Sequence, residues 1–124
     1  LQNIKFKWVL VDESTQATEP TALVPLAVPG ASEATHLCLL GDPLQLPPTV
    51  VSSGAIQLGL STTLFERLAN QKFPQHFLAV QFRMHNSIAE FPSAQFYGGC
   101  LTTGIANDAQ TRPPVSGFDW PLGC

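Results

Sequence analysis

Two short apolar runs, each followed by an acidic residue, mark the first part of the chain. Phe6–Val11 combines β-branched and aromatic residues and stops at Asp12, and His36–Leu40 leads through a glycine to Asp42. Runs of this length and composition predict buried strands. A helical pattern lies between them, so we expect a parallel strand–helix–strand unit with a right-handed crossover. Asp12 and Asp42 should then emerge at one carboxyl edge of the sheet, where open α/β sheets bind ligands.

Three segments carry the signals of helices. The stretch from Thr18 to Pro20 is typical of a helix start, and Pro25 should keep that helix short or kinked. Ser61 is expected to cap a second helix with apolar residues at helical spacing. Ser87–Glu90 fits a capping box that opens a third helix, which Pro92 should interrupt.

The remaining segments read as connections, apart from one further strand. Residues 43–60 are rich in Pro and Gly and predict a loop, and residues 70–75 predict a linker. Phe77–Phe82 predicts a third strand. Gly98–Gly99 should end the third helix, and from Leu101 onward we expect mostly loop.

Composition indicates a globular chain. Hydrophobic residues make up 44% and charged residues 12% of the 124 positions, and no apolar run approaches the roughly 20 residues needed to cross a bilayer. The net charge of −3 argues against a free-standing nucleic-acid binder, because phosphate neutralisation favours a basic surface. Any contact with nucleic acid should therefore use charge from elsewhere in a longer protein.

The cysteines and the ends of the chain bear on its context. Cys38, Cys100 and Cys124 form no CxxC pair, so neither a disulfide nor a zinc site is expected, and a reducing compartment fits best. The chain begins in a strand-like run and stops without a closing element, so we interpret it as a segment of a longer protein. Its localisation is expected to be intracellular, with cytoplasm and nucleus both open.

The acidic pair after the first strand has the order of a Walker B motif. Asp12 at the strand tip can hold Mg²⁺, mostly through water, and Glu13 can face the water that attacks a γ-phosphate. The alternative is an ordinary acidic turn, because such pairs often follow strands. The pair alone does not decide between the two interpretations.

A proline-rich loop follows the second strand. Gly41–Pro48 can hold Gln45 rigidly at the ligand edge, where its amide both donates and accepts hydrogen bonds and can contact a γ-phosphate or a water. The alternative is a stiff turn with a solvated glutamine. The neighbouring Asp12 and Glu13 favour the first interpretation.

A basic residue ends the third predicted strand. Arg83 is one of six Lys and Arg residues, and its guanidinium could reach a phosphate as an arginine finger. The alternative is a surface salt bridge. For His85 we prefer a helix-capping or packed role to metal ligation.

These segments together resemble motifs II, III and IV of superfamily 1B helicases, the branch that includes the RNA helicase of nonsense-mediated decay. The three segments are Val11–Pro20, Gly41–Pro48 and Gln81–His85. Connecting segments also match the family's pattern: Gly59–Ser61, Leu64–Leu68, Glu90–Ser93, Phe96–Tyr97 and Gly117–Pro121. The resemblance covers nearly the whole chain, and three ordered motifs with similar spacers are more specific than any one of them.

The resemblance implies a role for five residues. Asp12 would organise Mg²⁺ and Glu13 would be the hydrolytic base, while Gln45 would sense the γ-phosphate of ATP. Arg83 would be an arginine finger from a second RecA-like domain. Phe82 stands where relatives often have tyrosine, and its ring should still stack on adenine.

The resemblance also implies a partial RecA-like P-loop NTPase fold of the α/β class, with a parallel sheet flanked by helices. Residues 1–70 would be the carboxyl-terminal part of the first RecA-like domain, 71–75 a linker, and 76–124 the start of the second. An ATP cleft between the domains would couple hydrolysis to movement along single-stranded RNA or DNA. Which nucleic acid is used, the direction of movement and the protein partners stay open.

A phosphate-binding loop is not evident. Gly54–Ser61 has the glycine spacing of a P-loop, but Leu60 occupies the position of the required lysine. We therefore expect the isolated chain neither to hydrolyse ATP nor to fold cooperatively. The rival hypothesis is a helicase-like remnant that binds nucleic acid or protein without catalysis. A GxxxxGK[ST] motif upstream in the longer protein would favour the enzyme.

Overall fold

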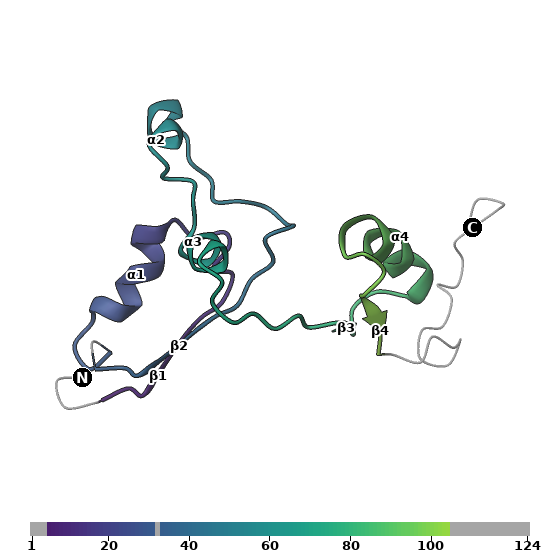
Figure 1. Cartoon of the computed structure of the whole chain (residues 1–124), viewed down its shortest axis with the longest axis horizontal. Helices are drawn as coiled ribbons and strands as arrows, with labels where there is room; N and C mark the ends of the chain where they lie inside the picture. The colour runs from purple at the N-terminus through teal and green to yellow at the C-terminus, as the bar shows by residue number, and fades with distance from the viewer. Residues whose placement is uncertain (1–4, 32, 105–124) are drawn as a thin grey trace, which may run out of the picture. The chain divides into compact units, whose positions relative to one another are not determined.

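The computed structural model describes residues 5–31 and 33–104 (Figure 1). Its elements follow in the order β1 (Trp8–Val11), α1 (Glu19–Ala27), β2 (His36–Leu39), α2 (Ser53–Gln57), α3 (Leu64–Asn70), β3 (Val80–Gln81), α4 (Asn86–Phe96) and β4 (Thr102–Thr103). The chain forms two compact units, divided after Gln75. The first unit holds the elements from β1 to α3, and the second those from β3 to β4.

The first unit is built on a parallel pair of strands. β1 and β2 pair in register from Trp8 opposite His36 to Val11 opposite Leu39. One further backbone bond continues the pair, because the Leu40 N–H donates to the Val11 carbonyl at 2.9 Å. The predicted parallel pairing of these two strands is confirmed, although both are shorter than the apolar runs in the sequence.

Helix α1 connects the two strands. It begins at Glu19, has Pro20 in its first turn, and ends two residues after Pro25. Pro25 has no backbone N–H and so removes one hydrogen bond of the helix, which ends soon after it. The predicted short helix is therefore confirmed. Its buried residue Ala22 and the buried Val9 of β1 belong to a core of small side chains.

The prediction of an unbroken loop over residues 43–60 is wrong. Helix α2 lies within it, and its N-cap Ser52 accepts a hydrogen bond from the Ala55 N–H at 3.3 Å. Figure 1 shows α2 standing clear of β1 and β2. The glycine and proline content of the segment concealed this single helical turn. The helix also covers part of Gly54–Ser61, which agrees with rejecting that segment as a phosphate-binding loop.

The predicted cap at Ser61 is also wrong, since α3 begins two residues later. Thr63 is the N-cap, and its hydroxyl accepts from the Glu66 N–H at 3.0 Å. The Glu66 carboxylate in turn accepts from the Thr63 N–H at 3.1 Å, which completes a capping box. Glu66 decides the start of the helix because Ser61 has no acidic residue three positions later.

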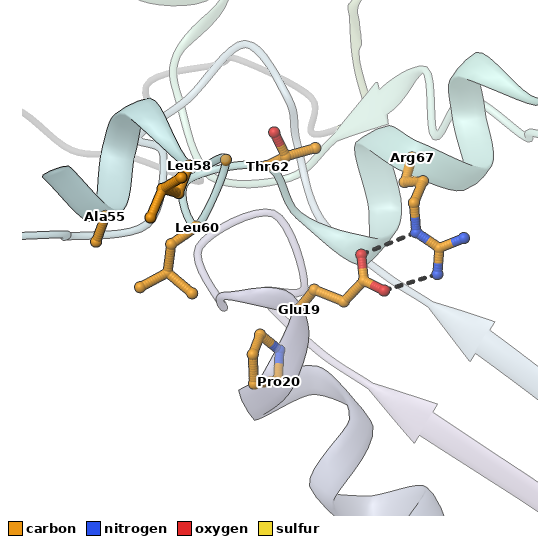
Figure 2. A pocket seen from close by; sticks show the side chains of 8 residues that line it. Glu19, Pro20, Ala55, Leu58, Leu60, Thr62 and Arg67 are labelled. Atoms are coloured by element: carbon orange, nitrogen blue, oxygen red, sulfur yellow. Dashed lines mark hydrogen bonds and ion pairs between the residues drawn. The ribbon is translucent and has the colours of Figure 1, made fainter.

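An ion pair joins α1 to α3 (Figure 2). The Arg67 Nε and Nη2 atoms donate to the two carboxylate oxygens of Glu19 at 2.8 and 2.7 Å. These hydrogen bonds, assisted by the charge of Arg67, hold the pKa of Glu19 below its ordinary value of 4.5. The fork of the guanidinium matches the carboxylate in geometry, which allows two parallel hydrogen bonds between the two helices.

The second unit contains a short parallel pair of strands and one helix. Val80 and Gln81 of β3 pair with Thr102 and Thr103 of β4. The predicted strand Phe77–Phe82 is therefore shortened to the two residues that have a partner strand. β4 is a two-residue exception to the mostly loop structure expected from Leu101 onward, because two consecutive threonines carry too little apolar pattern to predict a strand. Residues 105–124 of that prediction lie outside the described residues.

Helix α4 starts and ends at recognisable signals. Its N-cap is His85, whose Nδ1 accepts from the Ser87 N–H at 3.3 Å, so the capping box at Ser87–Glu90 is wrong and the capping role of His85 is confirmed. Pro92 lies inside the helix and does not interrupt it, also against prediction. Gly98 and Gly99 adopt positive φ values of 58° and 77° just after the helix, as expected for its end.

Some further predictions concern membrane-spanning segments, the cysteines and the end of the chain. None of the helices in the described ranges is long and apolar enough to cross a bilayer. Cys38 is half-buried and Cys100 is exposed, and each carries a free thiol. Cys124 and the matching segment Gly117–Pro121 lie outside the described residues.

Candidate functional site

A tight turn after β1 carries the acidic pair. The Asp12 Oδ1 atom accepts from the Glu13 N–H at 2.9 Å, and both residues are exposed. Glu13 has a φ of 51°, in the left-handed region that non-glycine residues rarely adopt. Such a backbone costs on the order of 1–3 kcal/mol and is enriched at functional sites. Lys72 shares this conformation just after α3, so the strain adds to the motif at Glu13 and does not identify a site by itself.

A glutamine that the sequence analysis did not single out holds the Glu13 carboxylate. The Gln16 Nε2 atom donates to Glu13 Oε2 at 3.0 Å, and the Gln16 N–H donates to the Glu13 carbonyl at 2.9 Å. Gln16 thus fixes the direction of the carboxylate through one of its two oxygens. The three-residue spacing of the two side chains within one turn was the signal that could have found this contact.

Two buried residues fasten the turn to the end of β2. The Leu40 carbonyl accepts from both the Ser14 N–H at 2.8 Å and the Ser14 hydroxyl at 2.7 Å. The Thr15 hydroxyl accepts from the Asp42 N–H at 3.2 Å. Thr15 and Ser14 are both buried. The acidic turn and the loop after β2 are therefore held together at one edge of the strand pair, as the parallel pairing predicted.

Asp42 orients Gln45. The Asp42 carboxylate accepts from the Leu44 N–H at 3.0 Å through Oδ1 and from Gln45 Nε2 at 2.7 Å through Oδ2. A charged acceptor makes the second bond a strong one. Asp42 engages one N–H of the Gln45 amide, so the second N–H and the amide oxygen are the groups that Gln45 can present to a water or another partner. The motif predicted Gln45 as a site residue, whereas this role of Asp42 depends on a hydrogen bond that only the structure shows.

The second unit presents Arg83 on a turn between β3 and α4. The backbone N–H groups of Arg83 and Met84 both donate to Gln81 Oε1, at 2.8 and 2.7 Å. His85 then caps α4, so the turn is held at both ends. The Arg83 side chain is exposed.

The Phe82 ring lies against a glycine of the segment that follows β4. A Cβ atom added to Gly104 would clash with Phe82 Cε1, and it would lie 2.8 Å from Phe82 Cζ. The Phe82 side chain is nevertheless 66% exposed. One edge of the ring is thus supported by the backbone, while much of the rest is open to a partner such as a base.

The five predicted site residues form two groups, one in each unit of the structure. Asp12, Glu13 and Gln45 belong to the carboxyl edge of β1 and β2 in the first unit. Phe82 and Arg83 are neighbours on one turn of the second unit. The chemical roles assigned to these five residues from the sequence remain predictions.

Family models and relatives cover both units. One model described as an AAA domain matches residues 1–53, and another with the same description matches residues 60–122. The chain is 41% identical over 122 residues to a regulator of nonsense transcripts 1 homolog of Neurospora crassa. It is 45% identical over 109 residues to the probable helicase MAGATAMA 3 of Arabidopsis thaliana, and 43% identical over 118 residues to the ATP-dependent helicase NAM7 of Saccharomyces cerevisiae.

These alignments cover almost all of the chain and little of each relative. They include 98%, 88% and 95% of the chain, but 11%, 13% and 12% of the three relatives respectively. The chain therefore spans about a tenth of the length of the relatives that it matches.

Proposed function

Because the chain belongs to the AAA domain family and is a superfamily 1 helicase-like segment, we propose that it forms part of an ATP-dependent motor that moves along single-stranded RNA or DNA. The single observation that carries this proposal is the arrangement at the carboxyl edge of β1 and β2. A strained acidic turn and an oriented glutamine are fastened there to the ends of two parallel strands. The two units would be parts of a first and a second RecA-like domain.

Within the first unit we assign different roles to Glu13 and Gln45. Glu13 would accept a proton from the water that attacks the γ-phosphate, since its carboxylate is exposed and oriented by Gln16. Gln45 would accept a hydrogen bond from the same water through its amide oxygen, or donate one to a γ-phosphate oxygen through the N–H that Asp42 leaves available. Positioning of this kind is the main contribution that a protein makes to phosphoryl transfer.

Asp12 would hold Mg²⁺, and its surroundings fit that ion. Its exposed carboxylate already accepts the Glu13 N–H through Oδ1, which fixes the orientation of the group. In the described part of the chain no cluster of three or more His, Cys, Asp or Glu side chains is arranged to hold a metal. A single carboxylate suits Mg²⁺, which keeps several waters and shares its coordination with nucleotide phosphates. When bound, the ion would neutralise charge that develops on those phosphates.

The second unit would supply a cation and a ring. We assign Arg83 as the arginine finger that stabilises charge on the transferred phosphoryl group, and Phe82 as the ring that stacks on adenine. The support for Phe82 is its exposed ring resting against Gly104. The support for Arg83 is its place on a turn held at both ends by side chains.

The proposal is tested by steady-state ATPase activity of the full-length protein, with and without single-stranded RNA or DNA. Native protein is compared with Glu13→Gln, and Glu90→Gln on the exposed face of α4 serves as the matched control. We expect strand-stimulated hydrolysis that Glu13→Gln lowers by about 10²–10⁴-fold and that the control leaves unchanged. Strand binding without any hydrolysis by native protein would instead establish a non-catalytic binding module.

A further inference from the structure

The turn that carries Arg83 closes on a side chain instead of on its own backbone. Gln81 Oε1 accepts the N–H groups of Arg83 and Met84, at 2.8 and 2.7 Å. Gln81 Nε2 donates to the Met84 carbonyl at 2.8 Å. The amide therefore substitutes for the peptide group that would otherwise satisfy these backbone atoms, and it sets the path of the chain through the turn.

The same amide is anchored to the neighbouring strand. Gln81 Nε2 also donates to the Thr103 hydroxyl at 2.7 Å, and the two residues are partners in the β3–β4 pair. The Gly104 N–H donates to the Gln81 carbonyl at 2.9 Å. The side chain and the backbone of Gln81 are thus both held by β4 and the residue after it. The β3–β4 pair therefore fixes the position of the turn.

The hydrogen-bonding capacity of the Gln81 amide is filled. A primary amide has two N–H donors and two acceptor positions on oxygen, and all four are used by Met84, Thr103 and the N–H of Arg83. A fully satisfied, half-buried group of this kind has one preferred orientation, because any rotation breaks several bonds at once. No apolar or shorter side chain at this position can reproduce the four contacts.

From this geometry we propose that Gln81 is a positioning residue for the arginine finger Arg83, an inference that rests on the function proposed above. Gln81 acts through the backbone of the turn and contacts no reacting atom. An error of about 1 Å in the position of a catalytic group can cost about 100-fold in rate. Phe82 is seated on Gly104 instead, so binding of the adenine should depend less on the amide.

The test is a double-mutant cycle in the full-length protein. Gln81→Met keeps the length of the side chain and removes its four hydrogen bonds, and Arg83→Ala removes the finger. We expect Gln81→Met to lower kcat about 10–100-fold with little change in the KM for ATP. In the Arg83→Ala background the same change should cause little further loss, because the group that Gln81 positions is gone. Gln95→Met on the exposed part of α4 is the matched control.

A second variant and a second measurement keep the inference separate from stability and from the proposed function. Thr103→Val removes one anchor of the amide and should cause a smaller loss in kcat, again absent without Arg83. Hydrogen exchange of the peptide spanning residues 82–85 should speed up in Gln81→Met, whether or not the protein hydrolyses ATP.

An equal loss from Gln81→Met with and without Arg83 would mean that Gln81 supports the fold in general, and would overturn the inference. Absence of hydrolysis in native protein would defeat the proposed function, and unchanged exchange at residues 82–85 in Gln81→Met would then defeat the inference too. A loss of kcat confined to proteins that retain Arg83, with faster exchange in the turn, would establish it.

Discussion

Replacing Gly41 by alanine should destabilise the first unit and disturb the site at once. A Cβ atom at this position would lie 2.8 Å from Thr15 Oγ1, 2.9 Å from Thr15 Cγ2 and 3.0 Å from the Thr15 backbone nitrogen. Favourable contacts between such atoms lie at about 3.5–4.0 Å, so the end of β2 must move by roughly 0.5–1 Å. The Thr15 side chain could rotate, but its backbone nitrogen cannot.

The expected cost of Gly41→Ala is about 1–3 kcal/mol, the usual range for a methyl group forced against a buried side chain, here that of Thr15. In a domain of 150–250 residues each kcal/mol lowers the Tm by about 2–4 °C. The displacement also weakens the bond from the Asp42 N–H to Thr15 Oγ1, so the proposed ATPase activity should fall even at temperatures where the protein stays folded.

The control for Gly41→Ala is the same change at Gly54. There the nearest atom to an added Cβ is Ser52 Oγ at 3.8 Å, an ordinary contact, and the residue lies in α2. Alanine favours helices over glycine by up to about 1 kcal/mol, so Gly54→Ala should leave the Tm unchanged or raise it. The assay is thermal unfolding of the two full-length variants beside native protein. Equal Tm shifts for the two variants would refute the argument from close approach.

Three further changes test other contacts. Thr63→Ala removes the capping box of α3 and should cost about 0.5–2 kcal/mol in chemical denaturation, with no change in kcat once folded. The hydrogen bonds and charge of Arg67 lower the pKa of Glu19, so the ion pair stabilises the fold above pH 4.5. This contribution is lost as the pH falls through the lowered pKa of Glu19. The stabilities of native protein and Glu19→Gln should therefore become equal in acid. If the difference persisted unchanged at low pH, the ion pair would not be its source. Asp42→Asn weakens the hydrogen bond from Gln45 Nε2 to the side chain at position 42, and it should lower kcat for ATP about 10-fold with an unchanged Tm. An unchanged kcat would contradict the orienting role of Asp42.

The first unit could be predicted well from the sequence because its signals are local and strong. The runs ending at Asp12 and Asp42 are long enough to identify strands, and a single helix between them dictates parallel pairing. Errors arose where one contact outweighs composition. Glu66 draws the cap of α3 to Thr63, and the Ser52 hydroxyl starts α2 inside a segment rich in glycine and proline.

The second unit was harder to predict because its strands depend on each other across 20 or so residues. Phe77–Phe82 reads as a continuous strand, yet β3 extends only as far as β4 provides a partner. The candidate site was also predicted only in part. Motifs indicated Glu13, Gln45 and Arg83, while the groups that orient them come from hydrogen bonds that no motif describes.

The backbone of Glu13 sets a limit on how this protein could be made more stable. Its φ of 51° is comfortable for glycine and costly for glutamate, so Glu13→Gly would relieve the turn while removing the proposed base. Selection for stability alone would favour that change, and selection for hydrolysis would oppose it. A glycine at the corresponding position in a relative would therefore indicate that the relative has lost hydrolytic activity, even where every other motif is intact.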